Sequence, residues 1–183
     1  DTAYASGEEN QYQLAFTCKR LDVKAVKIAN ITDIDTIADA MDDNDIIVVD
    51  SFQALTVKTK MNSRALEQYA VSTLCNKAKE SECVVIFIMH LTKSGQLKGT
   101  SLVPHSVDVN MMISHDLERD DDTTRIISVS KNRFGQTIDV QAILGANGFH
   151  IGEKVTTGKK AKSKKDRKSA LKKQILELDP PNI

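Results

Sequence analysis

The first half of the sequence alternates short apolar segments with longer segments of helical periodicity. The segments that we expect to form strands are residues 2–6 (TAYAS), 25–30 (AVKIAN), 45–51 (DIIVVDS) and 83–90 (CVVIFIMH). The segments that we expect to form helices are residues 10–21, 33–41 and 63–81. Residues 45–51 and 83–90 are continuous apolar runs, which favour parallel strands covered on both faces. The alternation predicts an α/β fold with a mostly parallel, twisted sheet and right-handed crossovers.

The helical segments begin with residues that can cap them. Asp33 and Ser63 are the candidate N-caps of the second and third segments. The expected buried side of the first segment consists of Tyr12, Leu14, Ala15, Cys18 and Leu21. The expected common face of the third consists of Leu66, Tyr69, Ala70, Leu74 and Ala78.

The pattern changes after His90. Residues 91–106 are predicted to form a polar, glycine-containing loop, and residues 116–122 (DLERDDD) a solvated acidic turn. Short strands are predicted at residues 107–115, 124–131, 137–144 and 148–152. We expect this half to form an antiparallel extension of the same sheet.

The length of 183 residues suits one domain with a substantial core. No apolar run approaches the roughly 20 residues of a membrane span, so we expect a soluble, cytoplasmic protein without a signal peptide. Cys18, Cys75 and Cys83 form no CxxC pair, which indicates idle or buried thiols in a reducing compartment.

The formal net charge of zero hides a division along the chain. Residues 1–153 contain 15 Lys and Arg against 22 Asp and Glu, which leaves ten against three for residues 154–183. All ten of those cations lie between Lys154 and Lys173. We therefore divide the chain into a core domain, residues 1–153, and a basic, flexible tail, residues 154–183.

Three predicted strand ends carry side chains that can bind or activate a ligand. Ligands of open α/β sheets bind outside the carboxyl ends of the strands. Asp50 is placed there to hold Mg²⁺ through water, Glu8 to polarise an attacking water, and His90 to sense a phosphate. Each has an ordinary alternative. Asp50 and His90 can be structural strand ends, and Glu8 can complement a helix dipole.

Residues 127–140 (ISVSKNRFGQTIDV) are predicted to form two strands joined by a turn. The turn carries two cations, Lys131 and Arg133, next to Phe134 and Gly135. Solvated cations are common in exposed turns, so this stretch alone does not distinguish a surface turn from a site.

The combination of segments is more specific than its parts. YASGEENQYQLAFTCKRL, DIIVVDSFQAL, VVIFIMHLTKSGQLKGTSLVPHSVDVNMMI and SVSKNRFGQTIDVQAI resemble, in order and spacing, the RecA-like ATPase core of the RadA/Sms DNA-repair family. The resemblance covers residues 2–151 and is most distinctive at KNRFG, residues 131–135. The chain is also similar to hexameric replicative helicases. It is thereby expected to have a RecA-like P-loop NTPase fold, to use ATP and Mg²⁺, and to act on single-stranded DNA as a ring.

The resemblance also implies roles for individual residues. Glu8 matches the general base, His90 the strand-end sensor, and Asp50 the acid that holds Mg²⁺ through water, with Ser51 beside it. Arg133 matches a finger that reaches the nucleotide of the neighbouring subunit, and Lys131 supports it.

The resemblance places DNA contacts on two loops. Lys93 and Lys98 lie in the loop that faces DNA in the central channel, and Lys58, Lys60 and Arg64 lie on a second loop that can join it. Ordinary surface charge is the alternative for the last three. The Lys-rich tail can add nucleic-acid affinity or only solubility.

The sequence departs from the family pattern in its phosphate loop. The motif GxxxxGK[ST], whose amides and lysine hold the β- and γ-phosphates, does not occur in it. The zinc-binding and protease-like segments typical of the family do not occur either. Either a truncated piece of a longer ATPase or a natural remnant would explain this. We expect truncation, and ATP binding that is weak or absent.

Three functions remain open. The leading hypothesis is the core of a DNA-dependent ATPase of recombination or repair, inactive as this chain alone. The second is a non-catalytic DNA-binding or assembly module with the same fold. The third, a circadian-clock or signalling ATPase of the wider RecA superfamily, explains the hairpin of residues 131–135 less well.

Overall fold

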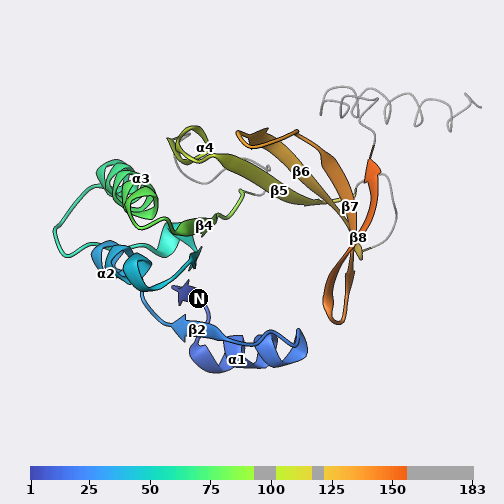
Figure 1. The fold of residues 1–183 in the computed structure, drawn as a ribbon, viewed down its shortest axis with the longest axis horizontal. Coiled ribbons are helices and arrows are strands. Elements are labelled where there is room, and N and C mark those ends of the chain that lie inside the picture. Colours follow the sequence, from blue (N-terminus) through green and yellow to red (C-terminus); the bar gives the residue numbers. More distant parts are fainter. Residues whose placement is uncertain (93–101, 117–121, 156–183) are drawn as a thin grey trace, which may run out of the picture.

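The computed structural model describes residues 1–92, 102–116 and 122–155. The first half forms a four-stranded parallel sheet with the strand order β2-β1-β3-β4 (Figure 1). Its strands are β1 (Thr2–Ser6), β2 (Val26–Ala29), β3 (Ile46–Asp50) and β4 (Val84–Ile88). The predicted alternation of parallel strands with helices is confirmed.

The helices of this half follow the expected segments. They are α1 (Gln11–Arg20), α2 (Ile34–Asp39) and α3 (Ser63–Glu80), with short 3₁₀ helices at Ala40–Asp43 (η1) and Phe52–Ala54 (η2). Asp33 caps α2, as predicted, because its side chain accepts a hydrogen bond from the Thr36 amide. The cap of α3 was predicted one residue too late: the side chain of Asn62, rather than Ser63, accepts the Ala65 amide.

The helices are divided between the two faces of the sheet. The chain passes from β1 to β2 in one direction along the sheet, and from β2 through β3 to β4 in the other. Right-handed crossovers then place α1 on one face and both α2 and α3 on the opposite face, as Figure 1 shows. One face of β3 and β4 therefore lacks a helical cover within the described residues.

This division corrects the expectation that the two apolar strands are covered on both faces. On β4 the side chains alternate: Val85 and Phe87 pack against the core, whereas Val84 is 56% exposed and Ile86 43% exposed. On β3, Ile47 and Val49 are buried and their neighbours only half-buried. A continuous apolar run did not reveal that, among the described residues, helices cover only one face.

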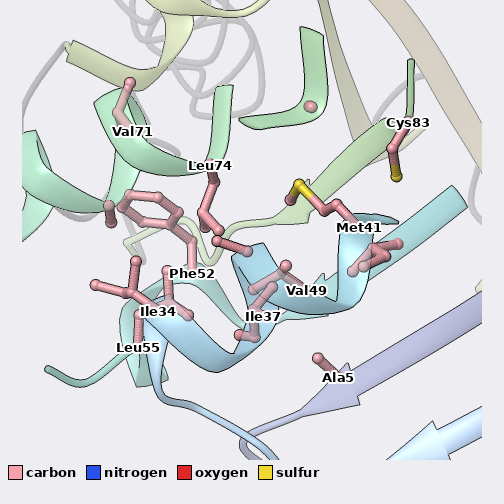
Figure 2. Close-up of a cluster of buried hydrophobic side chains, with 14 of the residues drawn as sticks. Ala5, Ile34, Ile37, Met41, Val49, Phe52, Leu55, Val71, Leu74 and Cys83 are labelled. Atoms are coloured by element: carbon pink, nitrogen blue, oxygen red, sulfur yellow. The ribbon is translucent and has the colours of Figure 1, made fainter. Parts of the chain in front are cut away.

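The core lies between the sheet and the pair α2 and α3. Figure 2 shows Val49 of β3, Phe52 of η2 and Leu74 of α3 meeting there with side chains of α2. The rings of Phe52 and Phe87 pack edge to face with centroids 5.3 Å apart. The predicted face of α3 is confirmed, since Ala70, Leu74 and Ala78 are buried and Leu66 and Tyr69 pack against the cluster.

Helix α1 buries less than its pattern predicted. Leu14 is buried, but Tyr12 is 79% exposed and Phe16 70% exposed. Ala15 is exposed, and Cys18 and Leu21 are half-buried. The expected buried side is therefore wrong for Tyr12 and Ala15, because α1 lies outside the core formed with α2 and α3.

The second half forms a separate antiparallel sheet with the order β5-β6-β7-β8. Its strands are β5 (Val109–His115), β6 (Thr124–Asn132), β7 (Asp139–Gly145) and β8 (Gly148–Val155). The antiparallel arrangement is confirmed. The expectation that it continues the first sheet is corrected, because within the described residues no ladder joins β4 to β5.

A short helix replaces the end of the predicted loop. Helix α4 (Leu102–Ser106) places Val103 in the core, against α3, so the apolar pair Leu102 and Val103 overrides the polar character of the segment. The remainder of that loop, most of the acidic turn and the basic tail beyond Val155 lie outside the described residues.

The expectations about thiols and membrane segments concern the same described residues. Cys18, Cys75 and Cys83 are free, and burial raises the pKa of the Cys75 and Cys83 thiols. Among the residues described, no helix has the length and apolar character that crossing a bilayer requires.

Candidate functional site

The register of the parallel sheet brings three predicted residues to one edge. Ser6 at the end of β1 is paired with Asp50 at the end of β3, and Asp50 with Ile88 at the end of β4. Glu8 and His90 each follow two residues beyond these ends. The carboxyl ends of parallel strands meet at the same edge, so the three side chains share one location.

Glu8 lies in a tight bend between β1 and α1. The Ser6 hydroxyl donates to the Glu9 carbonyl and accepts from the Glu9 amide, and Asn30 also donates to that carbonyl. Helix α1 begins only after Asn10, whose side chain and that of Gln13 form a capping box. The first turn of α1 contains no acid. Glu8 therefore lies outside the first turn of α1, where an acid complements the helix dipole most directly.

Gly7 is required for this bend by close packing. A Cβ at this position would lie 2.4 Å from Cβ of Ala54 and 3.0 Å from a methyl group of Thr32. The Gly7 amide also donates to the Asp50 carbonyl, which ties the bend to the end of β3. A side chain at position 7 would push the bend, and Glu8 with it, away from Asp50.

The side chains at this edge contact one another directly. Ser51, which is buried, donates from its hydroxyl to Oε1 of Glu8 at 2.6 Å. The other carboxylate oxygen of Glu8 lies 3.5 Å from Nε2 of His90. One ligand atom each from Glu8, Asp50 and His90 lies within 4.8 Å of the other two. The cluster is open to solvent, with side-chain exposures of 40% for Glu8 and 48% for His90.

Tyr4 belongs to this site and was missed in the sequence. Its hydroxyl donates to Oδ2 of Asp50 at 2.5 Å, and burial together with Asp50 raises the pKa of the phenol well above its usual value. Tyr4 lies on the strand next to Asp50, opposite Val48. A half-buried tyrosine needs a partner for its hydroxyl, but only the register of β1 against β3 identifies Asp50 as that partner.

The two cations of the hairpin lie at a different place. Lys131 ends β6 with Asn132, and Arg133 begins the turn to β7, as predicted. The Lys131 ammonium donates to the carbonyls of Pro104 and His105, and Arg133 forms an ion pair with Asp108 at 2.9 Å. These contacts do not include Glu8, Asp50 or His90.

The turn itself is held by Asn132. Its side chain accepts from the Phe134 amide and donates to the Gln136 carbonyl. Phe134 at the tip is 82% exposed. The hairpin thus presents an aromatic ring and a guanidinium that is 58% exposed on a turn closed by side-chain hydrogen bonds.

The predicted DNA contacts are only partly described. Lys58, Lys60 and Arg64 are exposed, on the loop before α3 and its first turn. Lys93 and Lys98 lie outside the described residues. A joint DNA contact of the two loops therefore stays a prediction.

No model of a protein family matches the chain. In sequence it is similar to proteins named DNA repair protein RadA. It is 30% identical to that of Haemophilus influenzae over 139 residues, which cover 72% of this chain and 30% of the relative. It is 28% identical to that of Chlamydia muridarum over 174 residues, which cover 85% and 38%. The chain spans about a third of the length of these curated relatives.

Solved structures of similar fold are far more distant in sequence. One solved ATPase domain has a TM-score of 0.68 at 13% identity, over 83% of this chain and 74% of that one. A DnaB-like replicative helicase has 0.69 at 12%, over 81% and 49%. A KaiC-like protein of Pyrococcus horikoshii has 0.64 at 13%, over 83% and 75%.

These neighbours and the strand-end site define the class of protein: the chain has the RecA-like fold of ATPase domains. Within this class the similarity in sequence is more specific. The chain is a RadA-like domain.

Proposed function

We propose that this domain is the core of a DNA-dependent ATPase of recombination or repair, and that the cluster at the sheet edge is its hydrolytic site. The observation that carries the proposal is the convergence of Glu8, Asp50 and His90, from three strand ends, at one solvent-accessible location. Hydrogen bonds that orient paired carboxylates are typical of sites that move protons or hold cations.

Glu8 acts as the general base in this proposal. One carboxylate oxygen is occupied by the Ser51 hydroxyl, which fixes the orientation of the group. The other faces His90 across 3.5 Å and is open to solvent, so it can accept a proton from a water that attacks the γ-phosphate. Ser51 is then a positioning residue, and His90 a neighbour that can sense the phosphate.

Asp50 would hold Mg²⁺ through water. Tyr4 occupies Oδ2, and the carboxylate retains further acceptor capacity for an aqua ligand of the ion. Carboxylate oxygen suits Mg²⁺, which keeps several of its waters in nucleotide sites. When bound, the ion neutralises charge on the phosphates. The motif GxxxxGK[ST], which would hold those phosphates, does not occur in the sequence, so we expect this chain alone to bind ATP weakly.

Lys131 and Arg133 would act on the nucleotide of a neighbouring subunit. Their contacts lie with residues 104–108 rather than with the cluster of their own chain. Arg133 remains 58% exposed despite its ion pair with Asp108, so it can reach an adjacent subunit. Such a finger stabilises charge on the transferring phosphoryl group.

The test needs a phosphate loop. We would fuse the phosphate-loop segment of a RadA-family ATPase ahead of Asp1 and measure Mg²⁺-dependent ATP hydrolysis with and without single-stranded DNA. Glu8→Gln should lower turnover by about 100-fold or more, because it removes the base but keeps the shape. The matched control is Glu9→Gln, which changes the adjacent carboxylate and should have little effect. Equal turnover in the Glu8→Gln variant and the parent fusion would contradict the proposal.

The role of Arg133 is tested in the same fusion. Arg133→Ala should reduce DNA-stimulated turnover by roughly 10³-fold, the lower end of the range for arginine fingers. Arg20→Ala, an exposed arginine at the end of α1, serves as the control. Unchanged stimulated hydrolysis in the Arg133→Ala variant would show that the finger assignment is wrong.

A non-catalytic DNA-binding or assembly module is the second candidate. The ten cations between Lys154 and Lys173 favour it. It predicts DNA binding that persists in the Glu8→Gln variant and disappears when residues 154–173 are deleted. Measuring binding to single-stranded DNA at two salt concentrations, in both variants, separates the two candidates.

A further inference from the structure

The three side chains at the sheet edge offer a set of ligand atoms that includes a nitrogen, which Mg²⁺ does not need. Glu8 and Asp50 offer oxygen, whereas His90 offers an imidazole nitrogen, and one such atom from each residue lies within 4.8 Å of the others. In the part of the chain that the structure describes, no other three metal-ligating side chains meet this closely. Imidazole is a ligand of transition metals, and Mg²⁺ prefers oxygen alone.

The charges around the cluster also favour a cation. Nε2 of His90 lies 3.5 Å from a carboxylate oxygen of Glu8, and among the ion pairs of the described residues neither Glu8 nor Asp50 meets a lysine or an arginine. By contrast, Asp42 is paired with Lys77 and Asp108 with Arg133. Two adjacent carboxylates repel each other unless a proton or a cation lies between them.

Groups behind the cluster hold both carboxylates in place. Tyr4 donates to one oxygen of Asp50 and Ser51 to one oxygen of Glu8, so each carboxylate keeps another oxygen for a ligand. Outer hydrogen bonds of this kind orient the ligands of metal sites. Metal–oxygen and metal–nitrogen distances of about 2.1 Å separate neighbouring ligand atoms by roughly 3 Å, so modest torsions of exposed side chains close the cluster onto an ion.

We propose that Glu8, Asp50 and His90 directly bind one divalent transition-metal ion, of the Mn²⁺ class, in preference to Mg²⁺ and without nucleotide. This goes beyond the proposed function: the ion would occupy the same site, but its binding does not depend on hydrolysis. A directly bound ion would neutralise the two carboxylates before any nucleotide arrives and would compete with the base role of Glu8.

The test uses the unaltered chain, freed of metal with a chelator and titrated with Mn²⁺ alone. The electron paramagnetic resonance signal of free Mn²⁺ should report one ion bound per chain, displaced by Mg²⁺ only in large excess. A pulsed electron paramagnetic resonance spectrum of the bound Mn²⁺ should show hyperfine coupling to the His90 nitrogen. His90→Ala and His90→Gln should each weaken binding by about tenfold or more and remove the nitrogen coupling.

Matched controls change nearby or similar side chains that lie outside the cluster. Glu9→Gln and His150→Ala alter an exposed carboxylate and an exposed imidazole and should leave Mn²⁺ binding unchanged. Glu8→Gln and Asp50→Asn should weaken it as His90→Ala does. Circular dichroism of every variant checks the fold.

Three results would overturn the inference: no saturable Mn²⁺ binding, binding that is unchanged in both His90 variants, or equal losses in the two controls. Because the titration contains neither nucleotide nor DNA, none of these results bears on the Glu8→Gln hydrolysis assay. Conversely, an inactive fusion protein leaves the metal titration standing.

Discussion

The parallel and antiparallel sheets of this domain differ in how they are covered. Helices α2 and α3 pack on one face of the parallel sheet, and the resulting cluster contains nearly all buried apolar side chains of the described residues. Among the side chains of the antiparallel sheet whose burial is described, only Thr124 and Ala142 are buried, whereas Met111 is 62% exposed and Ile151 67% exposed. Both sheets are rich in apolar residues, so composition does not explain the difference.

The difference shows that helical cover, rather than strand hydrophobicity, locates the stabilising core. It also separates two tasks. The parallel sheet positions Glu8, Asp50 and His90 at the ends of its strands, and the antiparallel sheet presents Arg133 and Phe134 on a turn. Rigid elements suit a site that requires precise distances, and an exposed hairpin suits contact with another molecule.

The largest contrast should come from truncating one apolar side chain in each sheet region. Leu74 of α3 is fully buried against the parallel sheet, whereas Ile113 of β5 is 53% exposed. Leu74→Ala should lower the free energy of unfolding by about 3–5 kcal/mol, because it leaves a cavity. Ile113→Ala should cost less than about 1 kcal/mol. Urea unfolding of both variants measures this.

An equal loss in the two variants would break the comparison, because it would mean that β5 is covered in solution. Repeating the measurement at several protein concentrations identifies a second copy as the cover. A stability that rises with concentration in the parent and not in Ile113→Ala would point to that copy.

Glycines provide the second contrast. Gly7→Ala places a methyl group 2.4 Å from Cβ of Ala54, and overpacking of this kind costs about 1–3 kcal/mol. At Gly135, in the hairpin, the added methyl meets only the side-chain nitrogen of Asn132, at 3.3 Å, so the cost should stay near about 0.5 kcal/mol. Thermal unfolding compares the two.

The site gives this contrast a second readout. Gly7→Ala should also weaken Mn²⁺ binding, because it displaces Glu8 from Asp50, whereas Gly135→Ala should not. Intact metal binding in a destabilised Gly7→Ala variant would mean that the bend moves as a unit with the end of β3.

Much of the fold could be predicted from periodicity. Strands, helices and the shared edge of Glu8, Asp50 and His90 follow from local pattern and from the general rule for parallel strands. What could not be predicted depends on neighbours distant in sequence. Tyr4 reaches Asp50 only through the register of β1 against β3, and Tyr12 is exposed because α1 packs on the face opposite α2 and α3.

The contacts of the hairpin also depend on residues distant in sequence. Its turn was predicted from residues 131–135, but the ion pair of Arg133 with Asp108 joins segments 25 residues apart. The apolar run at residues 83–90 predicted cover on both faces, because the sequence of a strand does not record where its crossover helices lie. The roles assigned to Lys131, Arg133 and the lysines of the loops remain predictions.

The third prediction concerns the helix that covers the parallel sheet. Asn62→Ala removes the side chain that accepts the Ala65 amide and should cost about 1 kcal/mol. Ser63→Ala, one residue later, is the control and should stay within about 0.5 kcal/mol, because Ser63 is the first helical residue rather than the cap. Chemical unfolding measures both. If Ser63→Ala cost more than Asn62→Ala, Ser63 would be the N-cap, as the sequence predicted.

The smallest effect on stability is expected at the ion pair of Arg133 with Asp108, beside the antiparallel sheet. Arg133 and Asp108 are 58% and 40% exposed, so their coupling in a double-mutant cycle of Arg133→Ala and Asp108→Ala should be about 0.2–1 kcal/mol. High salt should reduce it further. A coupling well above this range would mean that the pair holds β5 to the hairpin, and that Arg133 must break a strong contact before reaching a neighbour. A weak coupling leaves the guanidinium free to exchange Asp108 for another anion, which is what a residue acting on a second subunit requires.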